Sequence, residues 1–456
     1  MARNATGTAD EHGTDLPSET PPGPDGLPVL GNVRPLVDDP WAFYDELSEY
    51  GDVVSYSVPR MEFCTVLHPD LIERVLVTDN ERFGKFGFED LGGEFMSEGL
   101  LLAEGEQWQR QRTAAQQAFT PDRIREYGDA MGRYADEMAD EWADGETVAL
   151  DRRFSRLTLR ILSRSLFDLD LGGDADVVTE VAAAINDRGD LDGVSTFLPL
   201  WMPTPRNLRF RRAVSEFHPF VDDLIAERRG STDEYDDLLA SLMGAETDPG
   251  EHLPHEELRD SMATFLFAGH ETTSLALTYL VLLVSQHDDV RRRLHEEYEA
   301  VLGGRRPRLE DLPDLEYTER VIDETLRLYP PAYVIFRTAR EDVELGGYRI
   351  PEGTNLSLPQ FFVHTDDRWY DDPETFDPDR WTDEFEESLP EYAYFPFGGG
   401  PRHCIGMRFA MQELKTVVPT LLQRVEFELV SDPDPDLDMA LTLRPSEPVR
   451  ARVRHR

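Results

Sequence analysis

The stretch FGGGPRHCIG, residues 397–406, determines how the rest of the sequence is interpreted. Three consecutive glycines and a proline allow a tight turn that residues with a Cβ atom would resist. The turn carries one thiol, Cys404, and residues 405–422 continue with apolar side chains at helical spacing. We therefore expect Cys404 to lie at or just before a helix N-terminus, where the helix dipole and unpaired N–H groups favour the thiolate.

A lone cysteine beside a glycine-rich loop is more often an ordinary buried residue than a ligand. The ten residues together reverse that preference, because their pattern of Phe, Gly, Arg, Cys and Gly resembles the haem-binding loop of the cytochrome P450 family. The resemblance implies that Cys404 ligates the iron of haem b (iron protoporphyrin IX) and that Arg402 neutralises a propionate. It also implies that Phe397 covers the sulfur and that Gly406 lets the helix approach the porphyrin.

Trp108 and Arg112 are four residues apart in a predicted helix over residues 107–119, so they lie on one face. An aromatic ring packed on an arginine stem is a common surface arrangement, but the resemblance implies that this pair binds a haem propionate. Arg337, in a predicted strand, matches the family's third propionate arginine. For His364, a propionate contact and a surface position are equally open.

Residues 256–286 form a long, largely apolar predicted helix that contains AGHETT, residues 268–273. His270 and Glu271 interrupt the apolar run, so no membrane span is expected here. The stretch resembles the family's oxygen-activating helix, which implies that Glu271 relays protons from water and that Thr272 hydrogen-bonds the oxygen being activated. The alternative is a polar kink made by Ser/Thr back-bonding. His270 is either a packing residue or a minor member of the proton path.

Glu324 and Arg327 lie three residues apart on a predicted helix over residues 317–329, and most such pairs are surface ion pairs of little energetic value. The later motif FDPDRW supplies Arg380, and the resemblance implies that the three residues form a buried triad. We expect this triad to attach the cysteine loop to the scaffold, which is a structural role. Pro419, inside the predicted helix after the cysteine, is expected to kink or shorten that helix.

Two apolar segments are candidates for covering a substrate cavity. Residues 79–103 are rich in Gly and Phe, and residues 197–202 (FLPLWM) lie between two predicted helices, where the family places a mobile lid. Either segment would serve equally well to fill the core. The resemblance implies an apolar organic substrate, bordered by the candidate side chains Phe86, Phe88, Phe265, Ala268, Tyr333, Val334 and Ile335.

The fold class implied by the resemblance is mainly α, the cytochrome P450 fold, with a large helical domain and a small β-rich lobe. Periodicity predicts further helices over residues 41–50, 69–77, 124–169, 175–185 and 207–229, and strands over residues 53–58, 63–67 and 333–340. No linker interrupts residues 27–456, so we expect a single haem domain there. Residues 1–26 are polar and rich in acids, Gly and Pro, which predicts a disordered acidic tail without a membrane anchor.

The formal net charge is −45, and lysine occurs only at Lys85 and Lys415. A uniformly acidic surface stays hydrated where salt screens charge, so the composition indicates a halophilic protein, from a halophilic archaeon. Nucleic acid and anionic membranes are excluded as partners on the same grounds. Two cysteines in 456 residues make a disulfide framework implausible and favour a reducing, cytoplasmic location. We expect a monomer.

The function implied is a haem-thiolate monooxygenase that inserts one atom of O₂ into an apolar substrate. Electrons are expected from separate proteins, a ferredoxin and its reductase, that dock on the cysteine side near Arg123, Arg125, Arg408 and Lys415. Two alternatives stay open. One is a peroxide-driven peroxygenase or hydroperoxide isomerase, which the pair Glu271 and Thr272 argues against. The other is a haem-based sensor without turnover, which the lack of an output domain argues against.

Overall fold

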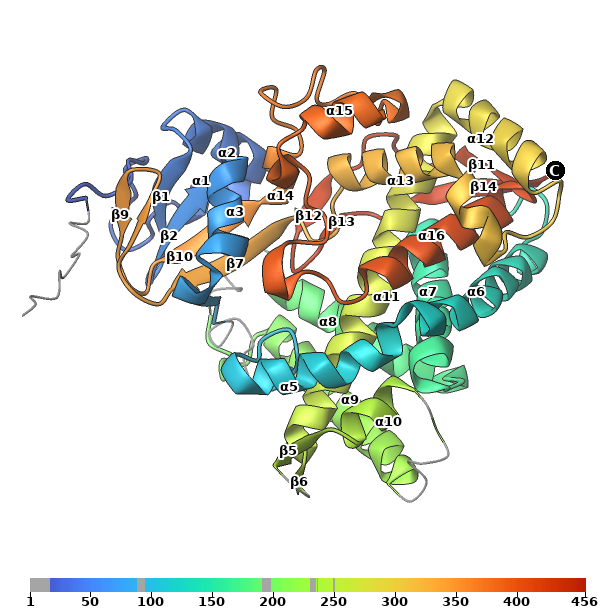
Figure 1. Ribbon diagram of the computed structural model, residues 1–456, viewed down its shortest axis with the longest axis horizontal. Coiled ribbons are helices and arrows are strands. Elements are labelled where there is room, and N and C mark those ends of the chain that lie inside the picture. The colour runs from blue at the N-terminus through green and yellow to red at the C-terminus, as the bar shows by residue number, and fades with distance from the viewer. Residues whose placement is uncertain (1–16, 88–94, 191–197, 230–234, 236, 249–250) are drawn as a thin grey trace, which may run out of the picture.

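The computed structural model describes residues 17–87, 95–190, 198–229, 235, 237–248 and 251–456. A strand-rich lobe lies at the left of Figure 1, and the rest of the molecule is mainly helical. The two regions meet along the segments that surround the cysteine turn. The predicted fold class, mainly α with a small β-rich lobe, is confirmed.

The lobe is built on a five-stranded sheet in the order β1-β2-β10-β7-β3, in which only the β10–β2 pair is parallel. It joins segments from both halves of the sequence: β1 (Val53–Val58), β2 (Met61–Val66), β3 (Phe83–Lys85), β7 (Val334–Ala339) and β10 (Asn355–Pro359). A hairpin of β8 (Val343–Leu345) and β9 (Tyr348–Ile350) forms a separate two-stranded sheet. The lobe also holds α1 (Val33–Asp38), α2 (Pro40–Ser48), α3 (Pro69–Glu73) and a π-helical turn over Arg74–Thr78.

The helical region contains the longest elements of the chain. Its helices are α5 (Gly105–Gln116), α6 (Pro121–Glu141), α7 (Leu150–Phe167), α8 (Ala175–Gly189), α9 (Pro205–Arg228), α10 (Leu238–Met243), α11 (His255–Gln286), α12 (Asp288–Val301), α13 (Glu316–Leu328), α14 (Gln360–Val363), α15 (Asp383–Ser388) and α16 (Met407–Leu422). Short strands at its edges are β4 (Thr147–Ala149), β5 (Glu246–Asp248), β6 (Glu251–His252), β11 (Val425–Leu429), β12 (Leu437–Met439), β13 (Leu443–Pro445) and β14 (Arg450–His455). Most of them contribute to the largest apolar core, whereas Phe361 and Val363 of α14 belong to the two smaller clusters.

Helix α11 crosses the centre of this region (Figure 1) and packs most extensively against α7, with α9, α13 and α16 also in contact. By length and composition alone it is apolar enough to cross a membrane, but 78% of its most apolar 18-residue window is buried inside the protein. An all-round apolar helix in that position is a core helix. It places the AGHETT stretch at the middle of the molecule.

Local sequence signals explain where several helices begin. Thr204 caps α9 by accepting a hydrogen bond from the backbone N–H of Asn207 over 3.1 Å, with Pro205 at the first helical position. Asp39 caps α2 in the same way through the N–H of Ala42 at 3.0 Å. These are the residue types that satisfy the unpaired donors of a first helical turn.

Three expectations need correction. The helix predicted over residues 124–169 is two helices, α6 and α7, because residues 147–149 form β4 and pair with β14. Helix α16 runs through Pro419 to Leu422, so the proline does not shorten it. Ordered backbone also begins before residue 26, since the carbonyls of Glu19 and Pro22 accept hydrogen bonds from strand residues. Residues 1–16 lie outside the described part of the chain.

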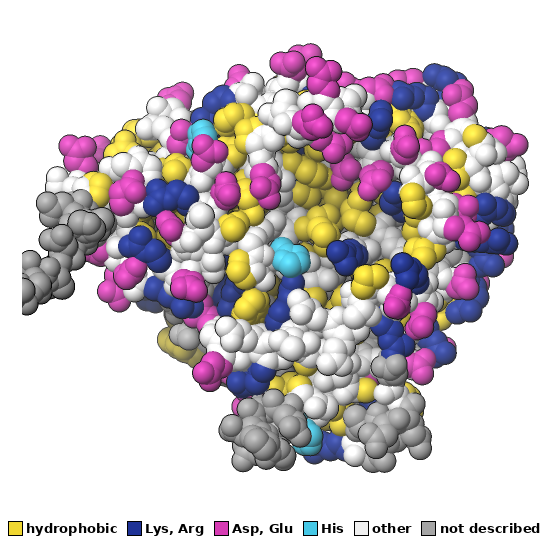
Figure 2. Space-filling model, viewed as in Figure 1, with side chains coloured by type: hydrophobic (Ala, Val, Ile, Leu, Met, Phe, Trp, Pro, Cys, Tyr) yellow, Lys and Arg dark blue, Asp and Glu magenta, His cyan; other side chains and the backbone are white. Residues whose placement is uncertain are grey.

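Acidic side chains are spread over the face shown in Figure 2 and do not gather in one patch. Arginines lie among them, and many form short-range ion pairs, such as Arg292 with Glu296 at 2.8 Å. The chain nevertheless has 91 acidic side chains against 46 basic ones, so nearly half of the carboxylates have no basic residue of their own.

Candidate active site

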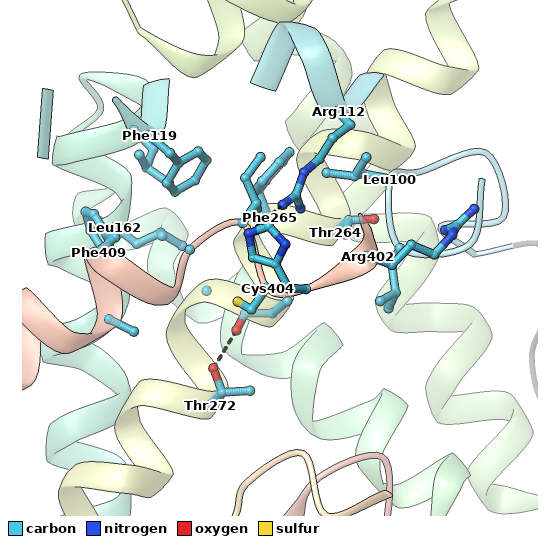
Figure 3. Close-up of a pocket in the computed structure, with 18 of the residues that line it drawn as sticks. Leu100, Arg112, Phe119, Leu162, Thr264, Phe265, Thr272, Arg402, Cys404 and Phe409 are labelled. Carbon is cyan, nitrogen blue, oxygen red and sulfur yellow. Dashed lines mark hydrogen bonds between the residues drawn. The ribbon is translucent and has the colours of Figure 1, made fainter. Parts of the chain in front are cut away.

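A cavity lies between α11 and the turn that precedes α16, with Cys404 exposed to it (Figure 3). It contains about 850 Å³ of empty space, the part open to solvent included. Its walls are mainly apolar and include Leu100, Phe119, Leu162, Phe265, Ala268 and Phe409. Polar groups enter it around the thiol, at a basic rim and at the threonines of α11. This is the shape and lining expected of a site for a large, mostly apolar cofactor and substrate.

The glycines of the cysteine turn are required by its geometry. Gly398 and Gly400 have φ angles of 70° and 64°, in the left-handed region that favours glycine. A Cβ atom on Gly400 would lie 2.0 Å from the carbonyl oxygen of Leu76, and one on Gly399 would lie 2.4 Å from the Tyr392 ring. The turn therefore packs directly against the β-rich lobe, and this holds the thiol in place.

Cys404 lies just before α16, as the sequence predicted, with Gly406 as the N-cap residue. Its backbone N–H donates to the carbonyl of Phe397 over 2.9 Å, which closes the turn. Burial raises the pKa of the Cys404 thiol, while the N–H of Gly406 and the guanidinium of Arg112 act in the opposite direction. A metal cation bound to the sulfur would also favour the thiolate, because coordinating thiols lose their proton.

The wall contributed by α11 carries Thr272, Phe265 and Ala268, three of the residues predicted to line the site. The hydroxyl of Thr272 donates to the Ala268 carbonyl over 2.9 Å, drawn as the dashed line in Figure 3. This is the back-bonding that was the alternative interpretation of the AGHETT stretch. The helix nevertheless stays continuous, and Thr272 also lines the cavity. Gly269 lets α7 pack closely, since a Cβ atom there would lie 2.6 Å from Leu162.

The basic rim brings together the residues predicted to bind propionates. Trp108, Arg112 and Arg402 line the cavity, and the guanidinium carbon of Arg402 lies 4.6 Å from the centre of the Trp108 ring. Arg337 is buried beside them on β7. Burial lowers the pKa of all three arginines, that of Arg337 to about 10.

The charge of this rim is only partly offset by the nearby carboxylate of Glu104, which pairs with Arg340. Within the described part of the chain, the guanidinium groups of Arg112, Arg337 and Arg402 donate to carbonyl oxygens or to a histidine but to no carboxylate. The buried Nε of Arg112 has no hydrogen-bond partner. Buried cations without counter-ions are costly unless an anionic ligand supplies the charge. One exposed sulfur, apolar walls and a rim of unpaired arginines fit a thiolate-ligated haem with its two propionates.

Glu271 faces away from this cavity and lines a second one, on another side of α11. Its Oε1 accepts a hydrogen bond of 2.9 Å from the side-chain amide of Asn186 on α8. The hydroxyl of Thr442 donates to the Asn186 carbonyl oxygen over 3.2 Å. The second cavity reaches the outside, because exposed Arg152 and Ser446 also line it. Water therefore has access to the Glu271 carboxylate without passing the thiol.

His270 is fully buried and also lines this second cavity. Its Nδ1 lies 2.5 Å from the Leu266 carbonyl oxygen, and its Nε2 has no hydrogen-bond partner but lies 3.9 Å from a Glu271 oxygen. Burial lowers the pKa of the His270 imidazole, with the Glu271 charge acting in the opposite direction.

Several predicted site residues lie outside the lining of the thiol cavity. Phe86 packs against Phe63 and Phe336 in the lobe, and the Tyr333 hydroxyl donates to the Ala440 carbonyl over 2.8 Å. The side chains of Val334, Ile335 and Phe397 pack against hydrophobic clusters beside the cavity. Phe88 lies outside the described residues. The structure thus brings together two of the seven substrate candidates, Phe265 and Ala268, around the cavity.

His364 is not a surface residue. It is fully buried, and its Nε2 accepts a hydrogen bond of 3.0 Å from the backbone N–H of Phe395. Burial lowers the pKa of its imidazole to about 3, so the ring is neutral. Because Phe395 lies two residues before Phe397, His364 anchors the start of the cysteine turn and lies away from the cavity lining.

Glu324 and Arg327 are fully buried and form a bidentate pair, with N–O distances of 2.8 and 2.7 Å. Arg380 donates to the same carboxylate over 3.1 Å, and the Trp381 indole N–H does so over 2.9 Å. The backbone N–H of Asp377 adds a fifth donor at 3.0 Å. Arg327 then reaches the carbonyls of residues 364, 373 and 375. The Glu324 carboxylate therefore anchors to α13 the long segment that leads to the cysteine turn.

Sequence reasoning missed several residues of the cavity, namely Lys85, Leu100, Leu101, Phe119, Leu162, Leu166 and Phe409. The apolar ones carry no signal that separates a cavity wall from a core. Lys85 did carry one, because it is one of only two lysines in the chain.

Comparisons with known proteins agree with this geometry. The sequence matches the cytochrome P450 family over residues 21–452. Pentalenene oxygenase from Streptomyces avermitilis is 33% identical over 439 residues, which cover 94% of this chain and 96% of that protein. Cyclooctat-9-en-7-ol 5-monooxygenase from Streptomyces melanosporofaciens is 33% identical over 415 residues, 90% of each chain.

A solved structure, cyanobacterial CYP120A1 with retinoic acid bound, superimposes with a TM-score of 0.86 at 26% identity and covers 97% of this chain and 100% of its own. Fold, family match and relatives named as oxygenases lead to the same conclusion. The chain belongs to the cytochrome P450 family, and it is a haem-dependent monooxygenase of that fold, which uses O₂, an electron donor and an organic substrate.

Proposed function

We propose that this protein inserts one atom of O₂ into an apolar organic substrate, with electrons supplied by separate redox proteins. The observation that carries the proposal is the thiol of Cys404 facing, across an apolar cavity, the hydroxyl-bearing wall of α11. Cys404 and the basic rim would hold a haem, which would supply the reduction of O₂ by two electrons and two protons, with one oxygen atom going to the substrate and the other leaving as water.

The protein's own groups have separate tasks in this reaction. Cys404 supplies the thiolate ligand, and Arg112, Arg337 and Arg402 balance the propionates. Thr272 Oγ1 holds a hydroxyl proton at the edge of the cavity. The Glu271 carboxylate collects protons from water in the second cavity and passes them toward Thr272 around the helix.

A cyclic isoprenoid is the substrate class that we favour. Two relatives are named for pentalenene and cyclooctat-9-en-7-ol, and the similar structure has retinoic acid bound; all three compounds are isoprenoids. The apolar lining by Leu100, Phe119, Phe265 and Ala268 suits such a hydrocarbon skeleton. Titrating the ferric protein with a panel of cyclic and linear lipophilic compounds, and following the spin-state change, tests the class. A response to fatty acids alone would contradict it.

The primary test is the spectrum of the reduced carbon monoxide complex. Thiolate ligation predicts a strongly red-shifted Soret band, which Cys404→Ala must abolish. Turnover with NAD(P)H, ferredoxin and ferredoxin reductase is then compared with turnover on hydrogen peroxide alone. Product formed equally well from peroxide without electron donors would favour the peroxygenase alternative, and absence of turnover with every substrate and donor would favour a sensor.

The docking face for the electron donor is proposed on the cysteine side, near Arg408. Arg408 is exposed, whereas Lys415 is nearly buried and pairs with Glu319 at 2.9 Å, and Arg125 pairs with Asp122 at 2.5 Å. Arg408 is therefore the cation of that face best placed to meet an acidic partner. We expect Arg408→Glu to slow reduction by ferredoxin while leaving reduction by dithionite unchanged.

A further inference from the structure

We propose that His270 is a positioning residue of the proton path, because its Nε2 atom and the Oε2 atom of Glu271 together hold one water molecule. The inference rests on the proposed monooxygenase function, in which Glu271 collects protons, and it gives His270 a task beside that carboxylate. His270 is fully buried in α11, and both residues line the second cavity.

The first argument concerns which nitrogen of the His270 ring carries the proton. Nδ1 lies 2.5 Å from the carbonyl oxygen of Leu266, one turn earlier in α11. A carbonyl oxygen only accepts hydrogen bonds, so Nδ1 must be the protonated nitrogen. Burial lowers the pKa of the imidazole, which favours the neutral ring. Nε2 therefore presents a lone pair to the cavity and acts as an acceptor.

The second argument is that the neighbouring donors are engaged elsewhere. The side-chain amide of Asn186 donates to Glu271 Oε1 over 2.9 Å, and the Thr442 hydroxyl donates to the Asn186 side-chain oxygen over 3.2 Å. The Ser274 hydroxyl donates to the backbone carbonyl of Glu271 over 2.8 Å. Among the described residues, Nε2 of His270 has no hydrogen-bond partner. A buried acceptor without a donor destabilises the protein, so this site favours a donor that comes from the cavity.

The third argument is the distance between the two acceptors. Nε2 of His270 and Oε2 of Glu271 lie 3.9 Å apart, which is too far for a direct hydrogen bond. One water molecule can donate to both atoms: two hydrogen bonds of about 2.8 Å would meet at roughly 90°, near the angle between the O–H bonds of water. The cavity opens to the surface beside Arg152 and Ser446, so further water can supply the third partner that a buried water commonly has.

The position of this water explains why a histidine, and not an apolar side chain, fills this place in α11. When Glu271 has passed a proton toward Thr272, the held water gives a proton to Glu271 Oε2 and takes one from the next water in the cavity. No net charge stays behind in the buried site. Proton transfer requires hydrogen-bond contact, so holding the water beside the carboxylate keeps the acid ready for the second proton of each cycle.

The test compares the unmodified holoprotein with His270→Leu, which fills the space without an acceptor, and His270→Gln, which places an amide oxygen near the position of Nε2. Thr179→Val is the matched control, because Thr179 lines the same cavity. A high-resolution crystal structure should show an ordered water within about 3.2 Å of both acceptor atoms. Nitrogen-15 NMR of the ferrous carbon monoxide form, with the signal assigned by its loss in His270→Leu, should show Nε2 without a proton.

The kinetic readouts are product formed per O₂ and hydrogen peroxide released. In His270→Leu the water should be absent, and the rate of product formation should fall about fivefold, the effect of one lost hydrogen bond, while peroxide release rises. His270→Gln should restore both the water and most of the product yield. The red-shifted carbon monoxide band and the substrate-induced spin shift should be the same in every variant.

Four results would overturn the inference: no ordered water between the two atoms in the unmodified protein, a proton on Nε2, a His270→Gln protein as impaired as His270→Leu, or an equal loss in Thr179→Val. If His270→Leu fails to fold, the crystal structure and the NMR spectrum of the unmodified protein decide, with the signal then assigned in His270→Gln. Failure of the monooxygenase proposal would be seen separately, as absence of turnover by the unmodified protein, because the water and the ring proton are observed without turnover.

Discussion

Glu271 and Thr272 are neighbours in α11, yet their side chains line two different cavities. Thr272 borders the cavity of the thiol, and Glu271 borders the one that reaches the surface beside Arg152 and Ser446. Successive residues of an α-helix point about 100° apart, so a single helix can separate the two spaces. In the proposed relay, protons would approach from a side that the apolar substrate does not share.

Removing the Thr272 hydroxyl should uncouple O₂ consumption from product formation. In Thr272→Ala, oxygen consumption should continue while the ratio of product to oxygen falls, because proton delivery in the cavity loses its last donor. Thr272→Ser, which keeps a hydroxyl, is the matched control and should retain most of the coupling. The measurement is product per O₂ with hydrogen peroxide release recorded beside it. Unchanged coupling in Thr272→Ala would contradict the relay.

Asn186 should affect turnover only through its hydrogen bond to the Glu271 carboxylate. Asn186→Leu removes the 2.9 Å hydrogen bond to the carboxylate and frees it to turn away. We expect a lower maximal rate and an altered pH profile of turnover, with the substrate-induced spin shift unchanged. Thr179→Val is the control, because Thr179 lies on the same helix and lines the same cavity. Equal effects of the two substitutions would assign Asn186 to general packing.

The carboxylate of Glu324 should be critical for stability. Glu324→Gln leaves Arg327 buried without its charge partner, and breaking such a pair typically costs about 3–5 kcal/mol. The thermal midpoint of the holoprotein should fall by several degrees or the protein should fail to accumulate. Glu296→Gln, which breaks the exposed pair with Arg292, should cost less than about 1 kcal/mol. A midpoint for Glu324→Gln as high as that of Glu296→Gln would refute the anchoring role.

The buried carboxyl of Glu413 should make the stability of the protein depend on pH. Its carboxyl is fully buried in α16, neither oxygen has a hydrogen-bond partner among the residues that the structure describes, and burial raises its pKa well above 4.5. The folded protein therefore binds this proton more tightly than the unfolded chain, so its contribution to stability declines as pH rises from about 4.5 toward the folded-state pKa. Glu413→Gln should raise the thermal midpoint at neutral pH, and the gain should shrink near pH 4.5. A constant difference at both pH values would contradict this.

The net charge of −45 predicts a strong salt dependence. Acidic side chains over the face in Figure 2 repel one another in dilute buffer, and salt screens that repulsion. The thermal midpoint should rise by many degrees between dilute buffer and molar KCl. Sodium and potassium chloride at equal concentration serve as controls for ion type. An unchanged midpoint would refute the proposed halophilic character.

The sequence was informative where backbone geometry restricts the residue type. The left-handed angles of Gly398 and Gly400, and the close approach of the turn to Leu76, leave glycine as the residue that fits, so the pattern alone predicts the turn. The buried pair Glu324 and Arg327 was predictable through the motif that supplies Arg380. Their helical spacing by itself does not distinguish a buried pair from an exposed one.

Other features depend on packing between distant segments, which periodicity does not reveal. Tyr333 looked like a cavity residue, but its hydroxyl bonds to Ala440, more than a hundred residues later. His364 is buried because the segment before the cysteine turn folds over it. The partnership of Lys85 and Arg337 arises from β3 pairing with β7, which are separated by most of the helical region.

The five donors that meet on Glu324 also limit how this region can evolve. Aspartate is one methylene too short to reach them all, and glutamine would turn an NH₂ group toward another donor. Neither replacement keeps every contact. We therefore expect the residues of the long segment before the cysteine to vary during evolution, while position 324 stays glutamate.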